Sequence, residues 1–527
     1  MARRMIEPLT GATYESLRDG FVWDLPPRAN MGVLCSDDQP PDHPALVLVP
    51  DVGERRVVTF GELSGMSDRL AAGLRSAGVE QGDRVAIVAP QSLETGLSHL
   101  ALWKLGAISL PLASLFGPDA LAYRLLDSGA RSAIVSPDNV EKVRAAVPDL
   151  DLIVTGSGGR FDELLGSTTQ FEAVDTSLDD PAFLIYTSGT TGPPKGALHA
   201  HRSVFGHLPS FELYYEFAPQ PGDVIWTPAD WAWIGGLMDV VIPGWYHGMT
   251  VLASDRRFDP LEAADLMAEQ RVTAAFLPPT ALKMMRRAGV HRTDLALRAV
   301  FTGGEALGEE MLLWANEALG TTINEGYGQT ECNLVVGNCR SVWPVRPGSM
   351  GRPIPGHEVA VLSDRGDPLI GEEGEICIRA PDPVMMLRYW NLPDATVNKY
   401  RDGWLRTGDL GVMDEDGYLW FRSRADDVII SSGYRIGPGE IEESLMGHPA
   451  VAMAAVVGVA DDMRGAVPAA FVVLNDGYGS DDALIRELQQ HVRTRLAAHE
   501  VPRSVTFLEE LPRTTTGKIM RRELRNR

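Results

Sequence analysis

Short runs of apolar residues recur along the first 300 residues and alternate with segments of helical spacing. Leu63, Met66, Leu70 and Leu74 recur at intervals of three and four residues, which predicts a helix with one apolar face, and 261–269 is a second such segment. Because the strand-like runs are apolar throughout, the alternation predicts an α/β protein with largely buried strands. The predicted strands are 84–89, 133–135, 183–186, 224–226, 250–252, 274–277 and 299–301.

The pattern changes after about residue 355. Polar and apolar residues alternate in 358–362, 374–379 and 417–421, which predicts an antiparallel β unit. The last hundred or so residues predict strands at 454–459 and 469–474 and a helix at 482–498. We expect a domain boundary near 423–427, with an N-terminal domain of residues 1–424 and a C-terminal domain of residues 425–527.

Composition and charge exclude several classes of protein. The chain has 527 residues, 44% of them hydrophobic and 23% charged, as in a globular protein with more than one core. Its formal net charge of -23 repels nucleic acid and anionic lipid, so we expect neither partner. A polyanionic substrate would therefore need local basic groups. Lysine is scarce, and only Lys195 and Lys518 of the six lysines lie in glycine-containing motifs.

Cysteine usage and the absence of long apolar stretches predict a cytoplasmic location. The four cysteines are too irregularly spaced for a disulfide framework or a zinc site. The basic start of the chain is not followed by the apolar stretch of a signal peptide. The longest apolar run, 451–459 with its flanking alanines, is too short to span a bilayer.

The strongest chemical signal is the segment Tyr186-Thr-Ser-Gly-Thr-Thr-Gly-Pro-Pro-Lys-Gly196, which directly follows a predicted strand. Its small residues let backbone N–H groups approach phosphate oxygens closely, and Lys195 adds a cation. Two prolines precede that lysine, so the segment is not a Walker loop. The segment predicts a phosphate-binding loop.

This loop resembles the phosphate loop of the adenylate-forming superfamily, which contains acyl-CoA synthetases, luciferases and peptide-synthetase adenylation domains. The resemblance runs from about Val57 to Arg522. It includes Thr302-Gly-Gly-Glu305, Glu325-Gly-Tyr-Gly-Gln-Thr-Glu331, Trp404-Leu-Arg-Thr-Gly-Asp409, Arg424-Ala-Asp-Asp427 and Pro512-Arg-Thr-Thr-Thr-Gly-Lys518. It implies a large N-terminal domain of two α/β subdomains plus a β unit, followed by a small mobile α+β C-terminal domain.

The resemblance also implies the ligands of individual residues. Glu325 would lie near the adenine amino group, Tyr327 would stack on adenine, and Thr330 would lie at the α-phosphate. Glu331 would bind Mg²⁺ and Lys518 would be catalytic, with Thr330 and Glu331. The full set implied for ATP or AMP is Thr187, Ser188, Gly189, Thr190, Thr191, Gly192, Lys195, Gly303, Gly304, Glu305, Glu325, Gly326, Tyr327, Gly328, Gln329, Thr330, Asp409, Arg424 and Arg435.

The remaining implied sites concern the thiol and the acid. Asp426 would be the hinge of the C-terminal domain, and Ser432 and Gly433 would contact coenzyme A. The acyl pocket would contain Trp233, Ile234, Gly235, Gly303 and Gly328. In acetyl-specific relatives a tryptophan fills the position that resembles Gly328, so the glycine predicts a larger, medium-length, branched or cyclic acid.

The sequence therefore predicts an ATP-dependent acid–thiol ligase, an acyl-CoA synthetase using ATP, Mg²⁺ and coenzyme A. Three alternatives stay open: an acyl-AMP ligase that loads an acyl carrier protein, an enzyme that catalyses only adenylation, and a catalytically inactive nucleotide-binding regulator. The identity of the acid and the oligomeric state stay open as well.

Overall fold

The computed structural model describes residues 4–7, 11–187, 193–304, 307–425, 427–431, 434–461, 464–496, 499–513 and 519–526. The chain divides into two compact units. The first comprises Met1–Thr187, Pro194–Val359 and Arg379–Gly403, and the second comprises Ser188–Pro193, Ala360–Ile378 and Trp404–Arg527. The boundary predicted between residues 424 and 425 stays a prediction. Among the described helices, none is long and apolar enough to cross a membrane.

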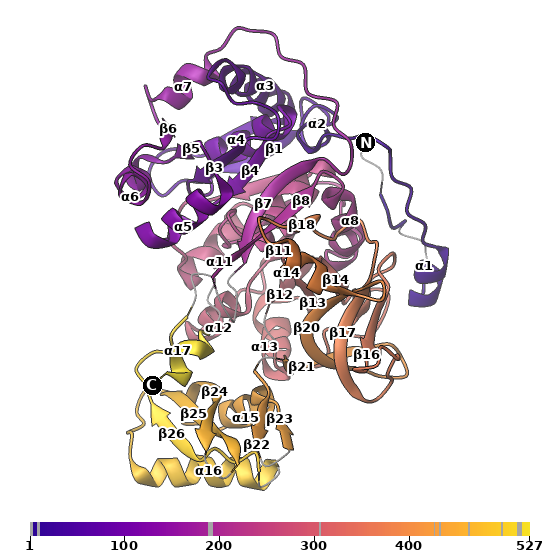
Figure 1. Ribbon diagram of the computed structural model, residues 1–527, viewed down its shortest axis with the longest axis vertical. Coiled ribbons are helices and arrows are strands. Elements are labelled where there is room, and N and C mark those ends of the chain that lie inside the picture. Colours follow the sequence, from indigo (N-terminus) through magenta and orange to yellow (C-terminus); the bar gives the residue numbers. More distant parts are fainter. Residues whose placement is uncertain are drawn as a thin grey trace. The chain divides into compact units, whose positions relative to one another are not determined.

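One sheet of the first unit has seven strands, and helices flank it (Figure 1). The strands from β7 to β6 are parallel, whereas β8 pairs antiparallel with both β7 and β18. In spatial order they are β18 (Arg388–Tyr389), β8 (Lys195–Ala200), β7 (Pro181–Thr187), β4 (Ile108–Pro111), β3 (Arg84–Val88), β5 (Ser132–Val135) and β6 (Asp151–Val154). The accompanying helices include α3 (Phe60–Ser76), α4 (Leu93–Lys104), α5 (Pro118–Ser128), α6 (Val140–Ala146) and α7 (Arg160–Leu165).

The other sheet of this unit has nine strands and is parallel from β1 to β13. In spatial order the strands are β15 (Arg352–Pro353), β14 (Asn333–Gly337), β13 (Ile323–Gln329), β12 (Ala299–Gly303), β11 (Ala274–Phe276), β9 (Val224–Trp226), β10 (Thr250–Ala253), β1 (Pro44–Leu48) and β2 (Arg56–Thr59). Its helices include α8 (Ser203–Tyr214), α9 (Ile234–Gly236), the π-helical turn η2 (Leu237–Val241), α10 (Ile242–Tyr246), α11 (Pro260–Glu269), α12 (Pro279–Arg287) and α13 (Glu309–Leu319).

The second unit contains an antiparallel β segment and an α+β segment. The first has β17 between β16 and β20, with β21 paired antiparallel to β20. The second is built on the long antiparallel pair of β24 and β25. The strands are β16 (Val359–Leu362), β17 (Glu373–Arg379), β20 (Trp404–Met413), β21 (Leu419–Arg424), β22 (Ile429–Ser431), β23 (Tyr434–Ile436), β24 (Val451–Asp461), β25 (Gly465–Leu474) and β26 (Ser504–Phe507), and the helices α15 (Pro438–Met446), α16 (Asp482–Arg495) and α17 (Arg521–Arg525).

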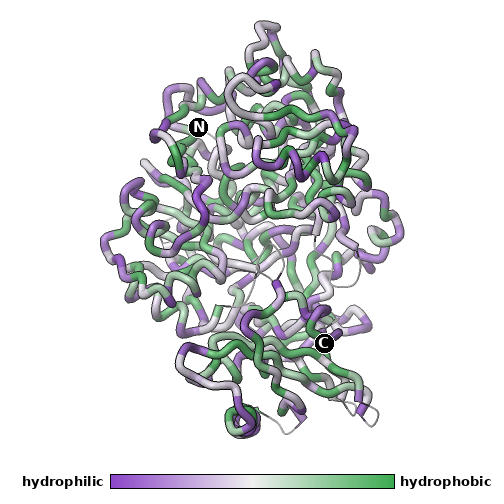
Figure 2. Tube along the Cα trace, turned by 90° about the vertical axis from the view of Figure 1, so that its left-hand side faces the viewer, coloured by the Kyte–Doolittle hydropathy of each residue, from purple (hydrophilic) through white to green (hydrophobic). Residues whose placement is uncertain are grey.

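The α/β class predicted from the apolar pattern is confirmed. All seven strands predicted before residue 355 are present, and the predicted apolar stripe of Leu63, Met66, Leu70 and Leu74 is buried on α3. Figure 2 shows mostly apolar residues in the interior and polar residues in the peripheral loops. The strands of the two sheets that were not predicted are β1, β2, β4, β6, β8, β13, β14, β15 and β18. On β13 the glycines and polar residues of 324–329 interrupt the apolar run from which a strand is predicted.

Helix α3 begins at a capping box and packs closely on α7. The Thr59 side chain accepts a hydrogen bond from Glu62 N, and the Glu62 carboxylate accepts one from Thr59 N. Farther along the helix, a Cβ added at Gly73 would lie 2.3 Å from the carbonyl oxygen of Leu164, the last residue but one of α7. The approach of these two helices therefore requires glycine at 73.

We predict that Gly73→Ala destabilises the protein, whereas Gly65→Ala on the same helix does not. A Cβ at Gly65 would meet only the end of the Arg69 side chain, at 3.6 Å. Replacing a glycine inside a helix by alanine gains about 0.5–1 kcal/mol where the Cβ has room, while overpacking at residue 73 costs about 1–3 kcal/mol. Thermal unfolding of both variants tests this, and an equal or higher melting temperature for Gly73→Ala contradicts the packing described.

Candidate active site

The predicted phosphate loop lies in the turn between β7 and β8. Thr187 and Lys195 face each other across the antiparallel pair, directly after the pair Tyr186–Gly196. The Tyr123 hydroxyl donates a hydrogen bond of 3.0 Å to Pro194 O. The loop residues 188–192 lie outside the described part of the chain, but the structure holds both of its ends in the sheet.

Tyr389 contacts both Lys195 and Glu331. Lys195 Nζ lies 5.2 Å from the centroid of the Tyr389 ring, a cation–π distance. The Tyr389 hydroxyl donates a 2.5 Å hydrogen bond to Glu331 Oε1. Burial and the neighbouring Glu331 carboxylate raise the pKa of Tyr389, so its hydroxyl keeps the proton that it donates. Strand β18, which pairs with β8, carries Tyr389 into this position.

Glu325 is a buried carboxyl with one open oxygen. It lies on β13 opposite Thr302 of β12, and the next pair is Gly303–Gly326. Glu325 Oε1 accepts a 3.1 Å hydrogen bond from Leu307 N, while Oε2 has no hydrogen-bond partner among the described residues. Burial raises the pKa of Glu325 to about 8. A ligand N–H group would satisfy the open oxygen.

The rest of this motif continues along β13 and past its end. Tyr327 pairs with Val336 of β14 and is largely buried. Gln329 Oε1 accepts a 3.1 Å hydrogen bond from Lys399 Nζ. The carbonyl of Glu331 accepts a hydrogen bond from Met386 N at 2.8 Å. Thr330 lies between Gln329 and Glu331, so the structure brings the predicted motif residues and Lys195 to one part of the first unit.

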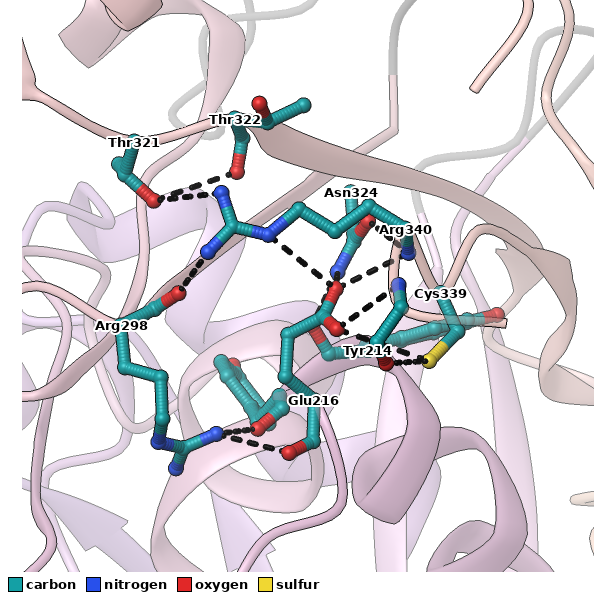
Figure 3. A network of polar contacts seen from close by, with 10 residues as sticks. Tyr214, Glu216, Arg298, Thr321, Thr322, Asn324, Cys339 and Arg340 are labelled. Carbon is teal, nitrogen blue, oxygen red and sulfur yellow. Dashed lines mark hydrogen bonds and ion pairs between the residues drawn. The ribbon is translucent and has the colours of Figure 1, made fainter. Parts of the chain in front are cut away.

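A network around Glu216 supports this strand (Figure 3). The Glu216 carboxylate accepts hydrogen bonds from Asn324 Nδ2 at 2.6 Å, Arg340 N at 3.0 Å and Ser341 N at 3.1 Å. The Arg298 guanidinium donates to the carbonyl of Glu216, whose φ is +54°. Because Asn324 directly precedes Glu325, the network ties the start of the motif to the chain that follows β14.

In the second unit, the structure brings together Asp409 and Arg424, both predicted to bind ATP or AMP. The two residues face each other in the antiparallel pair of β20 and β21, and Arg424 Nη1 lies 2.7 Å from Asp409 Oδ1. Arg424 also donates to Thr407 O at 3.3 Å. Asp409 is 4% exposed, and its burial beside the guanidinium keeps the pair in one geometry.

The structure corrects the argument drawn from Gly328. A Cβ at this position would lie 1.3 Å from Asn333 O, because β13 and β14 approach at an irregular pair next to Tyr327. Glycine at 328 is therefore required by the backbone of Asn333, and the missing side chain does not leave open space. Whether the backbone of Gly328 lines an acyl pocket stays a prediction.

The other predicted acyl residues also lie in close contacts. Trp233 packs edge-on against Phe116, with ring centroids 5.5 Å apart, and caps the start of α9, which holds Ile234 and Gly235. A Cβ at Gly235 would lie 2.9 Å from Phe276 Cε1. A Cβ at Gly303 would lie 2.8 Å from Gly326 O. These glycines permit close packing, and their role toward an acid stays a prediction.

Several predicted site residues lie outside the described residues, so their roles stay predictions. These are Ser188, Gly189, Thr190, Thr191, Gly192, Glu305, Asp426, Ser432, Gly433 and Lys518. Gly304 is described and has a φ of +96°. The backbone of Arg435 lies on β23, opposite Ile430 of β22.

Sequence reasoning missed Tyr389 and Lys399, which contact the predicted motif. Tyr389 stands in a segment of mixed apolar and basic residues, and no spacing rule connects it to Glu331, 58 positions away. Lys399 carried one usable signal, because it is one of six lysines in a chain rich in arginine. Its contact with Gln329 could not be predicted, because it depends on the course of the chain after β18.

We predict that Tyr389→Phe lowers ATP-dependent pyrophosphate release, the activity that the resemblance implies, by roughly 10–100-fold, since a hydrogen bond to a charged group is worth about 1.5–3 kcal/mol. Tyr123→Phe is the matched control, because it removes a hydroxyl whose hydrogen bond, among the described residues, is to the neutral carbonyl of Pro194. The control loses less activity. Equal losses in both variants would show that the Tyr389–Glu331 bond has no special role.

Comparison with known proteins agrees with this geometry. Residues 36–390 match the family described as AMP-binding enzyme, and residues 440–518 match the AMP-binding enzyme C-terminal domain. The uncharacterised acyl-CoA ligase YtcI of Bacillus subtilis is 34% identical over 494 residues, which cover 92% of this chain and 93% of that protein. The acetyl-coenzyme A synthetase of Bacillus subtilis is 34% identical over 484 residues, 89% and 84% of the two chains.

The crystal structure of a benzoate CoA ligase from Burkholderia xenovorans LB400 has a TM-score of 0.84 and 29% sequence identity, and the match covers 94% of this chain and all of that chain (100%). Its similarity extends over both compact units of the chain. The resemblance inferred from the motifs is therefore confirmed: the chain belongs to the AMP-binding enzyme family, within the adenylate-forming superfamily.

Proposed function

We propose that this chain is an AMP-forming acyl-CoA synthetase that activates a carboxylic acid with ATP and transfers the acyl group to coenzyme A. The observation that carries the proposal is the meeting of Lys195, Tyr389 and Glu331 at the base of the phosphate loop. The cation of Lys195 and the Glu331 carboxylate, hydrogen-bonded to Tyr389, thus lie beside a loop whose residues suit phosphates. The family match and the relatives named as CoA ligases support the thiol.

In the first half-reaction a carboxylate oxygen of the acid attacks the α-phosphorus of ATP. The bond to the bridging oxygen breaks, and acyl-AMP and pyrophosphate form. Two anions approach each other, so positioned cations and donors must offset their repulsion. We assign this role to Lys195, the loop 188–192, Thr330 and Lys518. Positive charges so close to the phosphates outweigh the repulsion of ATP that a net charge of -23 would cause.

The nucleotide itself is recognised by groups of different kinds. We assign adenine to Glu325, through its open Oε2, to the Tyr327 ring and to the turn of Gly303, Gly304 and Glu305. The ribose hydroxyls are assigned to Asp409 and Arg424, which already form one pair. We also assign Gly326, Gly328 and Gln329, which lie on the same strand as Glu325, to nucleotide binding. A buried carboxyl oxygen that lacks a partner fits an amino group that can donate.

Mg²⁺ fits this site only as an ion held mainly by phosphate oxygens. No group of three or more potential metal-ligating side chains occurs among the described residues, and one oxygen of Glu331 is already bonded to Tyr389. Glu331 would therefore supply a single carboxylate ligand, and bound Mg²⁺ would neutralise phosphate charge.

In the second half-reaction the thiol of coenzyme A attacks the acyl carbonyl, and AMP leaves as the carbon–oxygen bond breaks. We assign Ser432 and Gly433 to coenzyme A, Arg435 to a phosphate, and Asp426 to a hinge between residues 1–424 and 425–527. For the acid, we retain one larger than acetate, because a benzoate CoA ligase is similar to this chain. The acetyl-coenzyme A synthetase of Bacillus subtilis, at 34% identity, is similar as well, so overall identity does not choose the acid.

Pyrophosphate release from ATP with a panel of carboxylic acids, with and without coenzyme A, tests the proposal. We expect acid-dependent release that turns over only with coenzyme A and yields AMP and a thioester. Release without thioester formation would favour a carrier-protein acceptor or an enzyme of adenylation alone. No release with any acid would contradict the proposal in favour of a nucleotide-binding regulator.

We predict that Lys518→Ala lowers adenylation by roughly 10²–10³-fold or more, as expected when one donor to a developing charge is lost. Thioester formation from supplied acyl-AMP should be spared, because the bond that breaks in that step joins the acyl carbon to oxygen and the phosphorus is not attacked. Rapid-mixing measurements of each half-reaction test this. Equal losses in both would contradict a role confined to adenylation.

We also predict that adenosine binds more tightly as the pH rises from 6 to 8. The buried Glu325 carboxyl holds its proton up to a pKa of about 8. An amino group that donates to this carboxyl favours the ionised form, so binding releases a proton below that pKa, and the affinity rises with pH by up to about tenfold per unit. Calorimetry on the wild type and Glu325→Gln tests this: the variant should show a flat profile, and matching slopes would contradict the assignment.

A further inference from the structure

Asp239 is a carboxyl in an otherwise apolar turn. It stands in the middle of the π-helical turn η2, where Leu237, Met238, Val240 and Val241 are all buried. Asp239 itself is 5% exposed. π-Helical turns are rare and are frequent at functional sites. Such a turn and a carboxyl in its centre call for an explanation beyond packing.

The carboxyl has one hydrogen bond from the described residues. Asn333 Nδ2 donates to Asp239 Oδ1 at 2.9 Å. The Tyr215 hydroxyl donates to the backbone carbonyl of Asp239 at 3.1 Å, so this bond does not involve the carboxyl. Among the described groups that act on this carboxyl, none is a cation: Asn333 lowers its pKa, whereas burial dominates and raises the pKa to about 8.

The other oxygen is directed toward the segment predicted to bind the acid. A Cβ added at Gly235 would lie 3.6 Å from Asp239 Oδ2, so this oxygen faces the bare Cα of Gly235 one helical turn earlier. The partner Asn333 has a φ of +39° and places its own carbonyl against Gly328. Asp239 and Asn333 thus connect Gly235 and Gly328, which come from separate elements.

A structural role explains the hydrogen bond to Asn333 but not the choice of a carboxyl at residue 239. The hydrogen bond between Asp239 and Asn333 joins η2 to β14 and would be made equally well by an uncharged glutamine or asparagine. A buried carboxyl without a cation is costly. A strongly perturbed carboxyl in such a place is typical of a functional site. The open oxygen is best satisfied by a ligand.

We propose that Asp239, held by Asn333, is the polar end of the acyl pocket, so that the acid carries a hydrogen-bonding substituent, a hydroxyl or an amino group, on its acyl part. This inference rests on the proposed function and names the substrate class of that same site. Asp239 acts as a specificity-determining residue: its Oδ2 receives the substituent, and Phe276 beside Gly235 packs against apolar atoms of the acid. A plain hydrocarbon acid would leave the carboxyl oxygen unsatisfied.

A panel of matched acids tests the inference on the full-length protein. Each straight, branched or ring hydrocarbon acid is paired with analogues in which one distal methyl or ring hydrogen is replaced by a hydroxyl or an amino group. The readout is kcat/KM for acid-dependent pyrophosphate release. We expect at least one polar analogue to exceed its hydrocarbon partner by roughly 10–100-fold or more, as for a buried polar group that finds its partner.

Two variants identify the group responsible. Asp239→Leu, which is close in volume and apolar, should reverse the preference toward the hydrocarbon acid. Asp239→Asn keeps the hydrogen bonding but cannot carry charge, so it retains the preference for a hydroxyl and loses a preference for an amino group. Asp230→Asn is the control, because Asp230 is an acidic residue of the same segment whose carboxyl accepts a hydrogen bond from Ala232 N. It should keep the wild-type preference.

The outcomes separate this inference from the proposed function. If the wild type activates acids but does not prefer a polar analogue, the inference is wrong and the acyl-CoA synthetase proposal stands. If Asp239→Leu keeps the wild-type preference, Asp239 does not determine specificity. Should that variant fail to fold, the wild-type panel and Asp239→Asn still decide. Failure of every acid to release pyrophosphate would overturn both.

Discussion

The hydrogen bonds to the Glu216 carboxylate hold the part of the structure on which the candidate site depends. They reach Asn324 on β13 and the backbone of Arg340 and Ser341 after β14. A buried carboxylate that accepts several N–H groups is strongly stabilised, and it fixes those groups in turn. The next residue after Asn324 is Glu325, so the predicted nucleotide motif begins at a position that the network has already set.

Glycines then allow chains to approach where the motif runs. Gly328 lies against the backbone of Asn333, and Gly303 lies against the carbonyl of Gly326. Such close contacts leave no room for a Cβ at either glycine. Side chains from more distant segments complete the site: Tyr389 from β18 binds Glu331, and Lys195 from β8 lies over the tyrosine ring. A strongly acidic chain thereby has one of its few lysines at the end of the predicted phosphate loop.

Glu325 and Asp239 are buried carboxyls with the same physical signature. Burial raises the pKa of each to about 8, each has one described hydrogen-bond donor to its carboxyl, and neither has a cation among the groups that shift its pKa. Their positions differ, because Glu325 is in the predicted nucleotide motif and Asp239 faces the predicted acyl segment. Desolvation that would be a cost in a packed core becomes selectivity when a substrate supplies the missing partner.

The sequence by itself determined the fold class, about half of the described strands and the family, because these follow from local apolar periodicity and from motifs that are contiguous in the chain, such as 186–196 and 325–331. Strand β13 escaped the pattern because glycines that permit close approach and buried polar residues interrupt its apolar run. Only the tertiary structure decided that Tyr389 binds Glu331, that Asp239 meets Asn333, and that glycine at 328 is a packing requirement. Each of these contacts joins residues from separate elements, so their distance in space depends on how the sheets are assembled and leaves no trace in local spacing.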